Sequence, residues 1–461
     1  MFPENTYIER RSVLKHKLKS GLVLLFGNDE SPMNYTDNTY HFRQNSTFLY
    51  YFGIQHPGLI ALIDIDNNRD MIFGNDYTID DIVWMGPQPS IADRAAQCGV
   101  KDAFPLSKIP AILEFAKERG QTIHFLPLFR PENKIKIMNL LEVTPKQISD
   151  RYSVDLVKAV ISQREIKTLE EQEEIEKAVD ISVDMHVAVM KFARPGMTEA
   201  EVTAEIHKIA LAAGGNIAFP IIATKNGQTL HNHYHGNTIK EGDLFLVDAG
   251  YETPMGYAGD LSSTFPVGNY FTMEQKEIYE ITLRAHEAAI NALEYQKPFK
   301  NAHIAASKAI FEGLKAMGFT KGNTDDAFEA GAHALFFPCG TGHMMGLDVH
   351  DMEDLGEIWV GYDGHSKSTQ FGLKSLRLAK PLQEGHVFTI EPGIYFIPEL
   401  IDLWRSQKKF NEFINWEKVD SYRNFGGIRN EEDFVMTKTG AKLLGKPKPK
   451  TIEEVEAIRL L

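Results

Sequence analysis

The segment Leu244-Phe245-Leu246-Val247-Asp248-Ala249-Gly250 decides the fold of this chain, together with residues 259–266, Gly-Asp-Leu-Ser-Ser-Thr-Phe-Pro. A continuous apolar run of this length predicts a β-strand that is covered on both faces. The strand ends in the carboxylate of Asp248, and after a glycine-bearing turn the chain returns to a second carboxylate, Asp260. A buried charge without a partner is very costly, so these acids require a compensating cation. The predicted hairpin can therefore hold a divalent metal ion.

The composition describes a globular protein with two domains. A chain of 461 residues is too long for one ordinary core, and its 43% hydrophobic and 24% charged residues are typical of soluble proteins. The net charge of −14 argues against nucleic acid and anionic membranes as partners. Two cysteines, Cys98 and Cys339, cannot build a disulfide framework, which favours a reducing, cytoplasmic compartment. We expect neither a signal peptide nor a membrane span, because the sequence shows neither pattern.

Residues 1–160 are predicted to form the smaller domain, of α/β type, because short apolar strands alternate with helical patterns. The expected strands cover residues 21–27, 58–64 and 122–127, and the expected helices include residues 8–19 and 109–119.

Residues 161–461 are predicted to form an α+β catalytic domain. Three of its helices are expected to begin at capping boxes that open with Thr168, Thr198 and Thr272. Apolar runs predict strands at residues 244–247, 387–391 and 434–437.

Further acids and histidines stand where strand ends or loops are expected. They are His343 and His350 in a glycine-rich run, Glu391 after an apolar strand, Glu431 before another, and a histidine-dense loop at residues 230–237. Four carboxylates and one imidazole suit a pair of divalent ions such as Mn²⁺, Co²⁺ or Zn²⁺. Each residue alone also fits a structural role, as a strand cap or a hydrogen-bonded histidine. Three separate apolar strands that meet an acid favour the metal site.

These segments resemble the pita-bread metallopeptidases, the family of methionine aminopeptidase, aminopeptidase P and prolidase, and are most similar to its Xaa-Pro branch. The Asp248 hairpin, residues 343–351, Glu391-Pro392-Gly393 and residues 427–433 follow one another in the family's order. Residues 40–52 resemble the N-terminal domain of aminopeptidase P and prolidase. The resemblance implies an α+β fold, with a pita-bread catalytic domain preceded by a smaller α/β domain of the creatinase and aminopeptidase P N-terminal type.

The resemblance also implies two divalent metal ions per subunit, with Mn²⁺ first and Co²⁺ or Zn²⁺ as alternatives. Their ligands would be Asp248, Asp260, His343, Glu391 and Glu431, with Asp260 and Glu431 bridging the two ions. Two such ions would lower the pKa of a shared water and polarise the scissile carbonyl.

Other residues gain roles from the same resemblance. Glu391 would move the proton, while His350 and His233 would contact the substrate and stabilise the developing oxyanion. Compared with the family's pattern, two residues are inserted before His233, so His231 competes for its role. Arg429 would lie behind the metal ligands and orient them.

The implied activity is hydrolysis of the Xaa-Pro bond in small peptides with proline at the second position. A long insert after Gly393 and the position of Arg377 favour an Xaa-Pro dipeptidase, because Arg377 would hold the carboxylate of a dipeptide. Arg377 fits a surface arginine beside Lys374 equally well. An Xaa-Pro aminopeptidase that acts on longer peptides is the alternative. A catalytically inactive binding protein and a non-peptidase hydrolase of the creatinase kind are further alternatives.

Some residues depart from the family's pattern. Asp248 and Asp260 lie one residue further apart than usual, and we expect a β-bulge to absorb the extra residue. Cys339 replaces a histidine that is common in prolidases, and Asn430 replaces an aliphatic residue. The family also suggests a homodimer formed through the N-terminal domains. Trp84 resembles a tryptophan that reaches the neighbouring subunit's site, although a core or surface tryptophan is the simpler interpretation.

Overall fold

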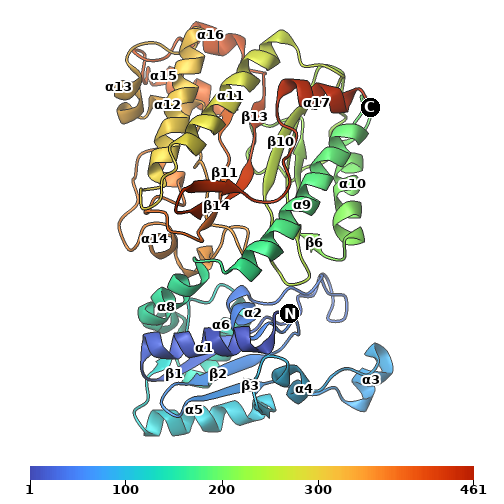
Figure 1. Ribbon diagram of the computed structural model, residues 1–461, viewed down its shortest axis with the longest axis vertical. Helices are drawn as coiled ribbons and strands as arrows, with labels where there is room; N and C mark the ends of the chain where they lie inside the picture. Colours follow the sequence, from blue (N-terminus) through green and yellow to red (C-terminus); the bar gives the residue numbers. More distant parts are fainter. The chain divides into compact units, whose positions relative to one another are not determined.

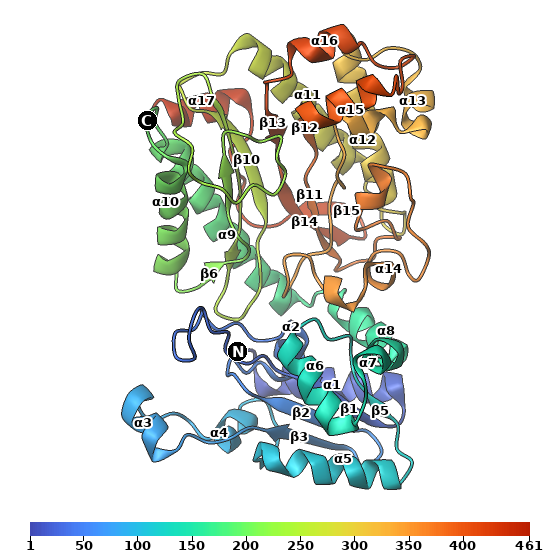
Figure 2. The ribbon, with the colours of Figure 1, turned by 180° about the vertical axis from the view of Figure 1, so that it is seen from behind.

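The structure, a computed structural model, describes all 461 residues and divides the chain into two units (Figures 1 and 2). The first unit comprises Met1–Arg164 and Met352–Trp359, and the second comprises Glu165–Asp351 and Val360–Leu461. The sequence places the domain boundary after residue 160, and this boundary remains a prediction. None of the helices combines the length and the hydropathy that crossing a membrane requires.

A five-stranded mixed sheet forms the centre of the first unit. Its strand order is β4-β3-β2-β1-β5, with the pairs β1–β5 and β3–β4 parallel and the others antiparallel. The strands are β1 (Leu22–Phe26), β2 (Ile60–Asp64), β3 (Arg69–Phe73), β4 (Asp102–Phe104) and β5 (Ile123–His124). The three predicted strands are confirmed as β1, β2 and β5. The apolar pattern missed β3, which opens with the charged residues Arg69 and Asp70, and β4, which is very short.

Helices cover both faces of this sheet. Leu22, Leu24 and Phe26 pack into one core with Leu113 and Ile137, and the alternate residues of β1 are buried on the opposite face. The helices of the first unit are α1 (Glu4–Leu18), α2 (Ser46–Phe52), α3 (Ile79–Met85), α4 (Ile91–Ala96), α5 (Ile109–Glu118), α6 (Pro131–Leu141), α7 (Pro145–Arg151) and α8 (Val154–Arg164).

The second unit holds its strands in several small antiparallel sheets. Two have three strands, in the orders β10-β8-β7 and β11-β14-β15, and two are the pairs β12–β13 and β6–β9. The strands are β6 (Asn216–Ile217), β7 (Ile222–Thr224), β8 (Leu244–Ala249), β9 (Tyr251–Glu252), β10 (Leu261–Pro266), β11 (Val387–Ile390), β12 (Gly393–Tyr395), β13 (Gly427–Arg429), β14 (Glu432–Thr437) and β15 (Gly440–Leu443). The three predicted strands are confirmed as β8, β11 and β14.

Long helices lie on one side of these strands: α9 and α11 are in front of them in Figure 1 and behind them in Figure 2. The helices are α9 (Leu169–Phe192), α10 (Glu199–Ala212), α11 (Met273–Asn291), α12 (Lys300–Ala316), α13 (Thr324–Ala330), α15 (Pro398–Ser406), α16 (Trp416–Ser421) and α17 (Ile452–Arg459). The short helix α14 (Glu357–Val360) spans the point where the chain passes from the first unit back to the second.

The helices α9, α10 and α11 begin at the predicted capping boxes. In each box the side chain of Thr168, Thr198 or Thr272 accepts a backbone N–H three residues on, and the Glu or Gln there accepts the threonine N–H. The box of α9 also contacts the turn of the β8–β10 hairpin, because the Tyr257 hydroxyl donates to Glu171 Oε1 at 2.9 Å.

β8 and β10 form the predicted hairpin, in which Asp248 lies opposite Ser262. The same register continues to an isolated bridge between Glu252 and Ala258, so the two strands carry no bulge. The expected β-bulge is therefore wrong. The turn over residues 253–257 accommodates the additional residue, because a turn can lengthen without shifting the pairing on either side of it.

We predict that Thr168→Ala lowers the free energy of unfolding by about 1 kcal/mol, because alanine cannot accept the Glu171 N–H at the start of α9. Urea unfolding followed by circular dichroism measures the change. Thr168→Ser keeps the hydroxyl and should unfold within about 0.5 kcal/mol of the natural chain. Equal losses in the two variants would contradict the role of the cap.

Candidate active site

The face of the hairpin that carries Asp260 also carries Ser262 and Thr264, because successive strand residues alternate between faces. Asp248 lies opposite Ser262 on β8, so its side chain shares this face. The face meets β13: the Arg429 backbone N–H donates to Thr264 Oγ1 at 3.1 Å, and Thr264 Oγ1 donates to the Arg429 carbonyl at 3.0 Å. The two acids of the hairpin are thereby brought beside Arg429.

Two further acids lie just beyond the paired ends of β11 and β14. Ile390 pairs with Glu432, so Glu391 and Glu431, the next residues outward, stand opposite one another. His343 runs alongside β11: its carbonyl accepts the Thr389 N–H at 3.0 Å, and its own N–H donates to Thr389 Oγ1 at 3.2 Å. This pairing holds His343 next to the two glutamates.

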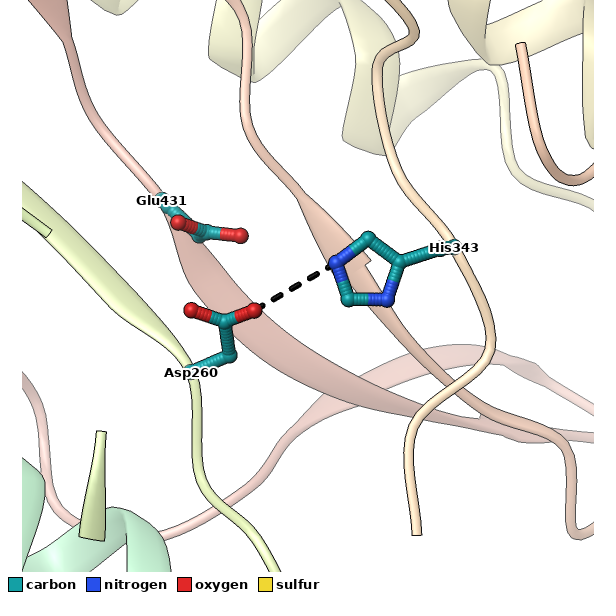
Figure 3. A group of neighbouring side chains, drawn as sticks. All are labelled: Asp260, His343 and Glu431. Atoms are coloured by element: carbon teal, nitrogen blue, oxygen red, sulfur yellow. Dashed lines mark ion pairs between the residues drawn. The ribbon is translucent and has the colours of Figure 1, made fainter. Parts of the chain in front are cut away.

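Asp260, His343 and Glu431 form a cluster whose possible ligand atoms all lie within 4.8 Å of one another (Figure 3). His343 Nε2 is 3.3 Å from Asp260 Oδ2 and 3.7 Å from Glu391 Oε1. His343 Nδ1 is 3.0 Å from the Met344 carbonyl oxygen, which can only accept, so Nδ1 carries a proton. In the neutral ring the lone pair of Nε2 therefore points at the carboxylates, as metal ligation requires.

Arg429 ties the acid-bearing elements together. Its Nε donates to Ser262 Oγ at 2.8 Å, one terminal nitrogen donates to the Tyr395 hydroxyl at 3.1 Å, and the other pairs with Asp248. Ser262 Oγ in turn donates to Glu431 Oε2 at 2.7 Å. Arg429 is buried, and it fixes Asp248 directly and Glu431 through Ser262.

The carboxylates carry more negative charge than the surrounding protein balances. Burial, and then the charge of Asp248, raise the pKa of Asp260 well above its usual value. Burial, and then the charges of Asp260 and Glu391, raise the pKa of Glu431 well above its usual value, and burial raises the pKa of Glu391 to about 7. Arg429 supplies one positive charge to these four acids.

Two carboxylate oxygens of this cavity-lining site are buried without a hydrogen-bond partner, Oδ1 of Asp248 and Oδ1 of Asp260. Buried polar atoms are normally paired, so such atoms mark places where an ion or a water binds. Carboxylate oxygens and an imidazole nitrogen in this arrangement suit Mn²⁺, Co²⁺ or Zn²⁺. The residues present therefore fit divalent metal ions.

A cavity of about 230 Å³ opens onto this cluster. Its lining includes every site residue predicted from the sequence: Asp248, Asp260, His343, Glu391, Glu431, Arg429, His231, His233, His350 and Arg377. The lining also includes an apolar group, Phe219, Pro220, Ile222, Leu230 and Val349. The structure thus brings the predicted residues together around one small cavity, while their chemical roles stay predictions.

Three histidines besides His343 line the cavity. The ring of His350 packs against that of His343, with centroids 4.3 Å apart. Burial lowers the pKa of His231, the charge of Asp248 raises it, and that of Arg377 lowers it. The charges of Asp248 and Arg377 therefore both act on His231.

The sequence reasoning missed Ser262, Tyr395 and Asp433. Ser262 orients Glu431, the Tyr395 hydroxyl accepts from Arg429, and Asp433 Oδ2 accepts the Asp260 N–H at 3.0 Å. A spacing of two residues separates Ser262 from Asp260 and Asp433 from Glu431. That spacing is the available signal, because residues two apart on a strand share a face. No comparable signal points to Tyr395.

Cys339, which departs from the family's pattern, also lines the cavity. Burial, and then the charge of Glu391, raise the pKa of the Cys339 thiol to about 12. In the metal-free protein this favours the protonated thiol, whereas the thiolate is the form that binds metals.

Comparison with protein families gives two matches. Residues 173–438 match the model of metallopeptidase family M24, and residues 7–124 match the model of the aminopeptidase P N-terminal domain. The chain is 32% identical to the Xaa-Pro dipeptidase of Homo sapiens over 95% of this chain and 88% of that relative. It is 31% identical to the probable Xaa-Pro aminopeptidase PEPP of Leptosphaeria maculans over 95% of this chain and 76% of that relative.

Solved structures of similar proteins cover the whole chain. Aminopeptidase PepP of Pseudomonas aeruginosa matches with a TM-score of 0.83 and 26% identity, over 100% of this chain and 98% of that one. Zinc-substituted aminopeptidase P of Escherichia coli in complex with product matches with a TM-score of 0.82 and 26% identity, over 100% and 99%. These matches confirm the predicted fold, a pita-bread domain preceded by a domain of the aminopeptidase P N-terminal type.

We predict that Arg429→Lys lowers the free energy of unfolding by about 3 kcal/mol, because one ammonium cannot serve Asp248, Ser262 and Tyr395 together. Urea unfolding of the metal-depleted protein measures the loss. Arg423→Lys is the matched control, since Arg423 forms an exposed pair with Asp402, and it should cost less than about 1 kcal/mol. Similar small losses for both variants would show that Arg429 does not hold the cluster.

Proposed function

The chain belongs to metallopeptidase family M24, and we propose that it hydrolyses the Xaa-Pro peptide bond. The observation that carries the proposal is the convergence of five ligand-type side chains on one cavity that also holds histidines and Arg377. Relatives that act on Xaa-Pro bonds match the chain along almost its entire length.

We propose Asp248, Asp260, His343, Glu391 and Glu431 as the ligands of two divalent ions, with Mn²⁺ preferred over Co²⁺ and Zn²⁺. The unpartnered carboxylate oxygens and the raised pKa values of Asp260 and Glu431 support this ligand set. Bound ions of this kind lower the pKa of water and polarise carbonyl groups.

The side chains around the cavity would orient the substrate and move the proton. The Xaa-Pro bond is a tertiary amide without an N–H, so its nitrogen must gain a proton when it leaves as proline. Glu391 is the candidate to take a proton from the attacking water and deliver it to that nitrogen. His350, together with His233 or His231, would donate hydrogen bonds to the developing oxyanion.

Arg377 favours a dipeptidase over an aminopeptidase. It lines the cavity, where a guanidinium can bind the C-terminal carboxylate of an Xaa-Pro dipeptide. A longer peptide would present an amide at that point and would lose the charged contact. The aminopeptidase alternative is supported by the aminopeptidase P structures, which match the whole chain.

We further propose a cytoplasmic homodimer that acts on small peptides and binds neither nucleic acid nor membranes. The net charge of −14 and the two unpaired cysteines support the partners and the compartment. Trp84 is 87% exposed on α3, beside the exposed side chains of Ile79 and Val83, so it is not a core residue. An exposed apolar group of this kind is typical of a protein interface and supports the dimer.

We predict that metal-depleted protein regains hydrolysis of Gly-Pro and Ala-Pro on titration with Mn²⁺ and cleaves Ala-Pro-Ala more slowly. Arg377→Gln should raise KM for the dipeptides about tenfold or more, which corresponds to a loss of ~1.4 kcal/mol or more of binding free energy. KM for the tripeptide should not change. Steady-state release of the N-terminal residue measures the KM values for both kinds of peptide.

The alternatives give other results in this assay. Equal rates on dipeptide and tripeptide would establish the aminopeptidase. No hydrolysis of any of these peptides with any of the three metals would leave the inactive binding protein or the creatinase-like hydrolase.

We predict that His231→Ala lowers kcat by about 10²-fold, the cost of losing a group that stabilises the oxyanion. Both histidines line the cavity, and the charges of Asp248 and Arg377 act on His231, whereas the resemblance points to His233. His233→Ala is the matched control from the same loop and should lower kcat less than tenfold. The opposite order of the two variants would return the role to His233.

A further inference from the structure

Lys448 is a buried lysine that no part of the mechanism uses. Residues 445–450 follow β15 and read Gly-Lys-Pro-Lys-Pro-Lys. The prolines keep this segment extended, and its lysines end in different surroundings. Lys446 pairs with Asp184 at the surface and Lys450 pairs with Glu432, whereas Lys448 is only 4% exposed.

The ammonium of Lys448 contacts no carboxylate. Lys448 Nζ donates to the Ser262 carbonyl at 2.8 Å and to Ser263 Oγ at 3.0 Å, both neutral groups. The other deeply buried lysines, Lys167 and Lys380, each contact an acid directly. A buried charge without a direct ion pair is costly, so Lys448 requires negative charge at longer range.

That negative charge lies in the acid segment at the start of β14. Burial lowers the pKa of Lys448 to about 8, while the charges of Glu432, Glu431 and Asp433 oppose the decrease. These acids therefore favour the protonated form of Lys448, whose ammonium donates to the Ser262 carbonyl and to Ser263 Oγ.

Backbone contacts connect Lys448 to the carboxylate cluster. The Ser262 carbonyl that accepts from Lys448 also accepts the Glu431 N–H at 3.1 Å. Ser263 points to the opposite face of β10 from Ser262, because neighbouring strand residues alternate. There the nitrogen Nδ1 of His186 accepts from Ser263 Oγ at 2.9 Å, and Nε2 donates to the Ala249 carbonyl at 3.0 Å. Lys448 is thus fixed behind the hairpin that carries Asp248 and Asp260.

We propose that Lys448 is a fixed countercharge for the carboxylate cluster, which stabilises the metal-free protein and weakens the binding of divalent ions. The proposal rests on the proposed function, because it takes these carboxylates to be the metal ligands. A positive charge close to the cluster attracts the acids when no ion is bound and repels an incoming cation. Lys448 would act through the field it adds to the site, as a positioning residue rather than a ligand.

A neutral residue at position 448 distinguishes an effect of the lysine's charge from an effect of its packing. Lys448→Gln removes the charge and leaves an N–H donor on a slightly shorter side chain. The metal-free variant should then be less stable than the natural chain, and it should gain more stability from Mn²⁺, because the stabilisation by a ligand grows with the logarithm of its affinity. A purely structural lysine would cost the same stability with and without metal.

The test compares Mn²⁺ affinity by isothermal titration calorimetry, and thermal unfolding with and without Mn²⁺, in four metal-depleted proteins. They are the natural chain, Lys448→Gln, the charge-preserving Lys448→Arg, and Lys446→Gln, which removes an exposed lysine of the same segment. We expect Lys448→Gln to lower the Kd for Mn²⁺ about tenfold, which is ~1.4 kcal/mol. The other two variants should stay within about threefold of the natural chain.

Each result decides between the proposals. An unchanged or higher Kd in Lys448→Gln, when the natural chain binds Mn²⁺, would overturn the role of Lys448 alone. A natural chain that binds no divalent ion would overturn the metal site and the role of Lys448 together. If Lys448→Gln is unfolded without metal, folding on addition of Mn²⁺ supports the countercharge, and failure to fold at saturating Mn²⁺ contradicts it.

Discussion

Repulsion among four largely buried carboxylates is the constraint on which the second unit depends. Asp248 and Asp260 come from one hairpin, and Glu391 and Glu431 lie beyond the paired ends of β11 and β14. The apolar strands bury the acids at their ends, and this burial raises the pKa values of Asp260, Glu391 and Glu431. Arg429 offsets part of the charge and Ser262 part of the lost hydration, so the remaining charge is available to bind cations.

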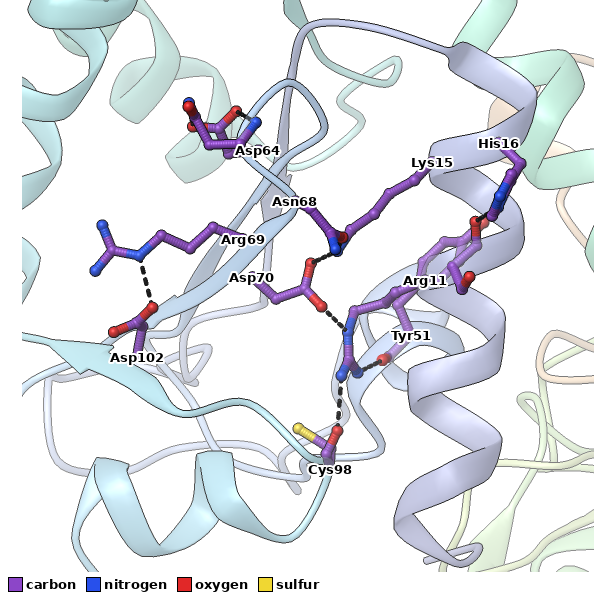
Figure 4. A network of polar contacts seen from close by, with 12 residues as sticks. Arg11, Lys15, His16, Tyr51, Asp64, Asn68, Arg69, Asp70, Cys98 and Asp102 are labelled. Atoms are coloured by element: carbon purple, nitrogen blue, oxygen red, sulfur yellow. Dashed lines mark hydrogen bonds and ion pairs between the residues drawn. The ribbon is translucent and has the colours of Figure 1, made fainter.

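The first unit shows how a buried charge is satisfied without a ligand (Figure 4). Arg11 Nε donates to Asp70 Oδ2 at 2.8 Å, and its terminal nitrogens donate to the carbonyls of Tyr51 and Cys98. Lys15 also pairs with Asp70, so two cations serve one carboxylate there. In the second unit the acids outnumber the cations that contact them, and Oδ1 of Asp248 and Oδ1 of Asp260 have no hydrogen-bond partner. This contrast distinguishes a structural ion-pair network from a site that is built to bind metal.

Features of the second unit that depend on local pattern could be predicted from the sequence. The apolar run before Asp248 and the capping box at Thr168 are complete within a few residues, and the structure confirms both. The position of the extra hairpin residue depends on which residues pair across the turn. The structure pairs Glu252 with Ala258, and a short stretch of sequence does not reveal this pairing.

The fold also gives different environments to residues that have similar sequence contexts. His231 and His233 lie on one loop and both line the cavity, so the sequence pattern does not separate their roles. The lysines at 446, 448 and 450 are equivalent in a Lys-Pro repeat, yet only Lys448 is buried behind the hairpin. Burial of a polar residue by a distant segment is a property of the fold, and sequence spacing carries no signal for it.

The number of bound ions tests the carboxylate cluster most directly. Equilibrium dialysis of the purified chain against Mn²⁺, followed by elemental analysis, counts the ions per chain. We predict two ions for the natural chain and a large loss in Asp260→Ala and Glu431→Ala, which lack the proposed bridging carboxylates. A folded natural chain that retains no divalent ion at saturating Mn²⁺, or bridging variants that keep both ions, would contradict the metal site.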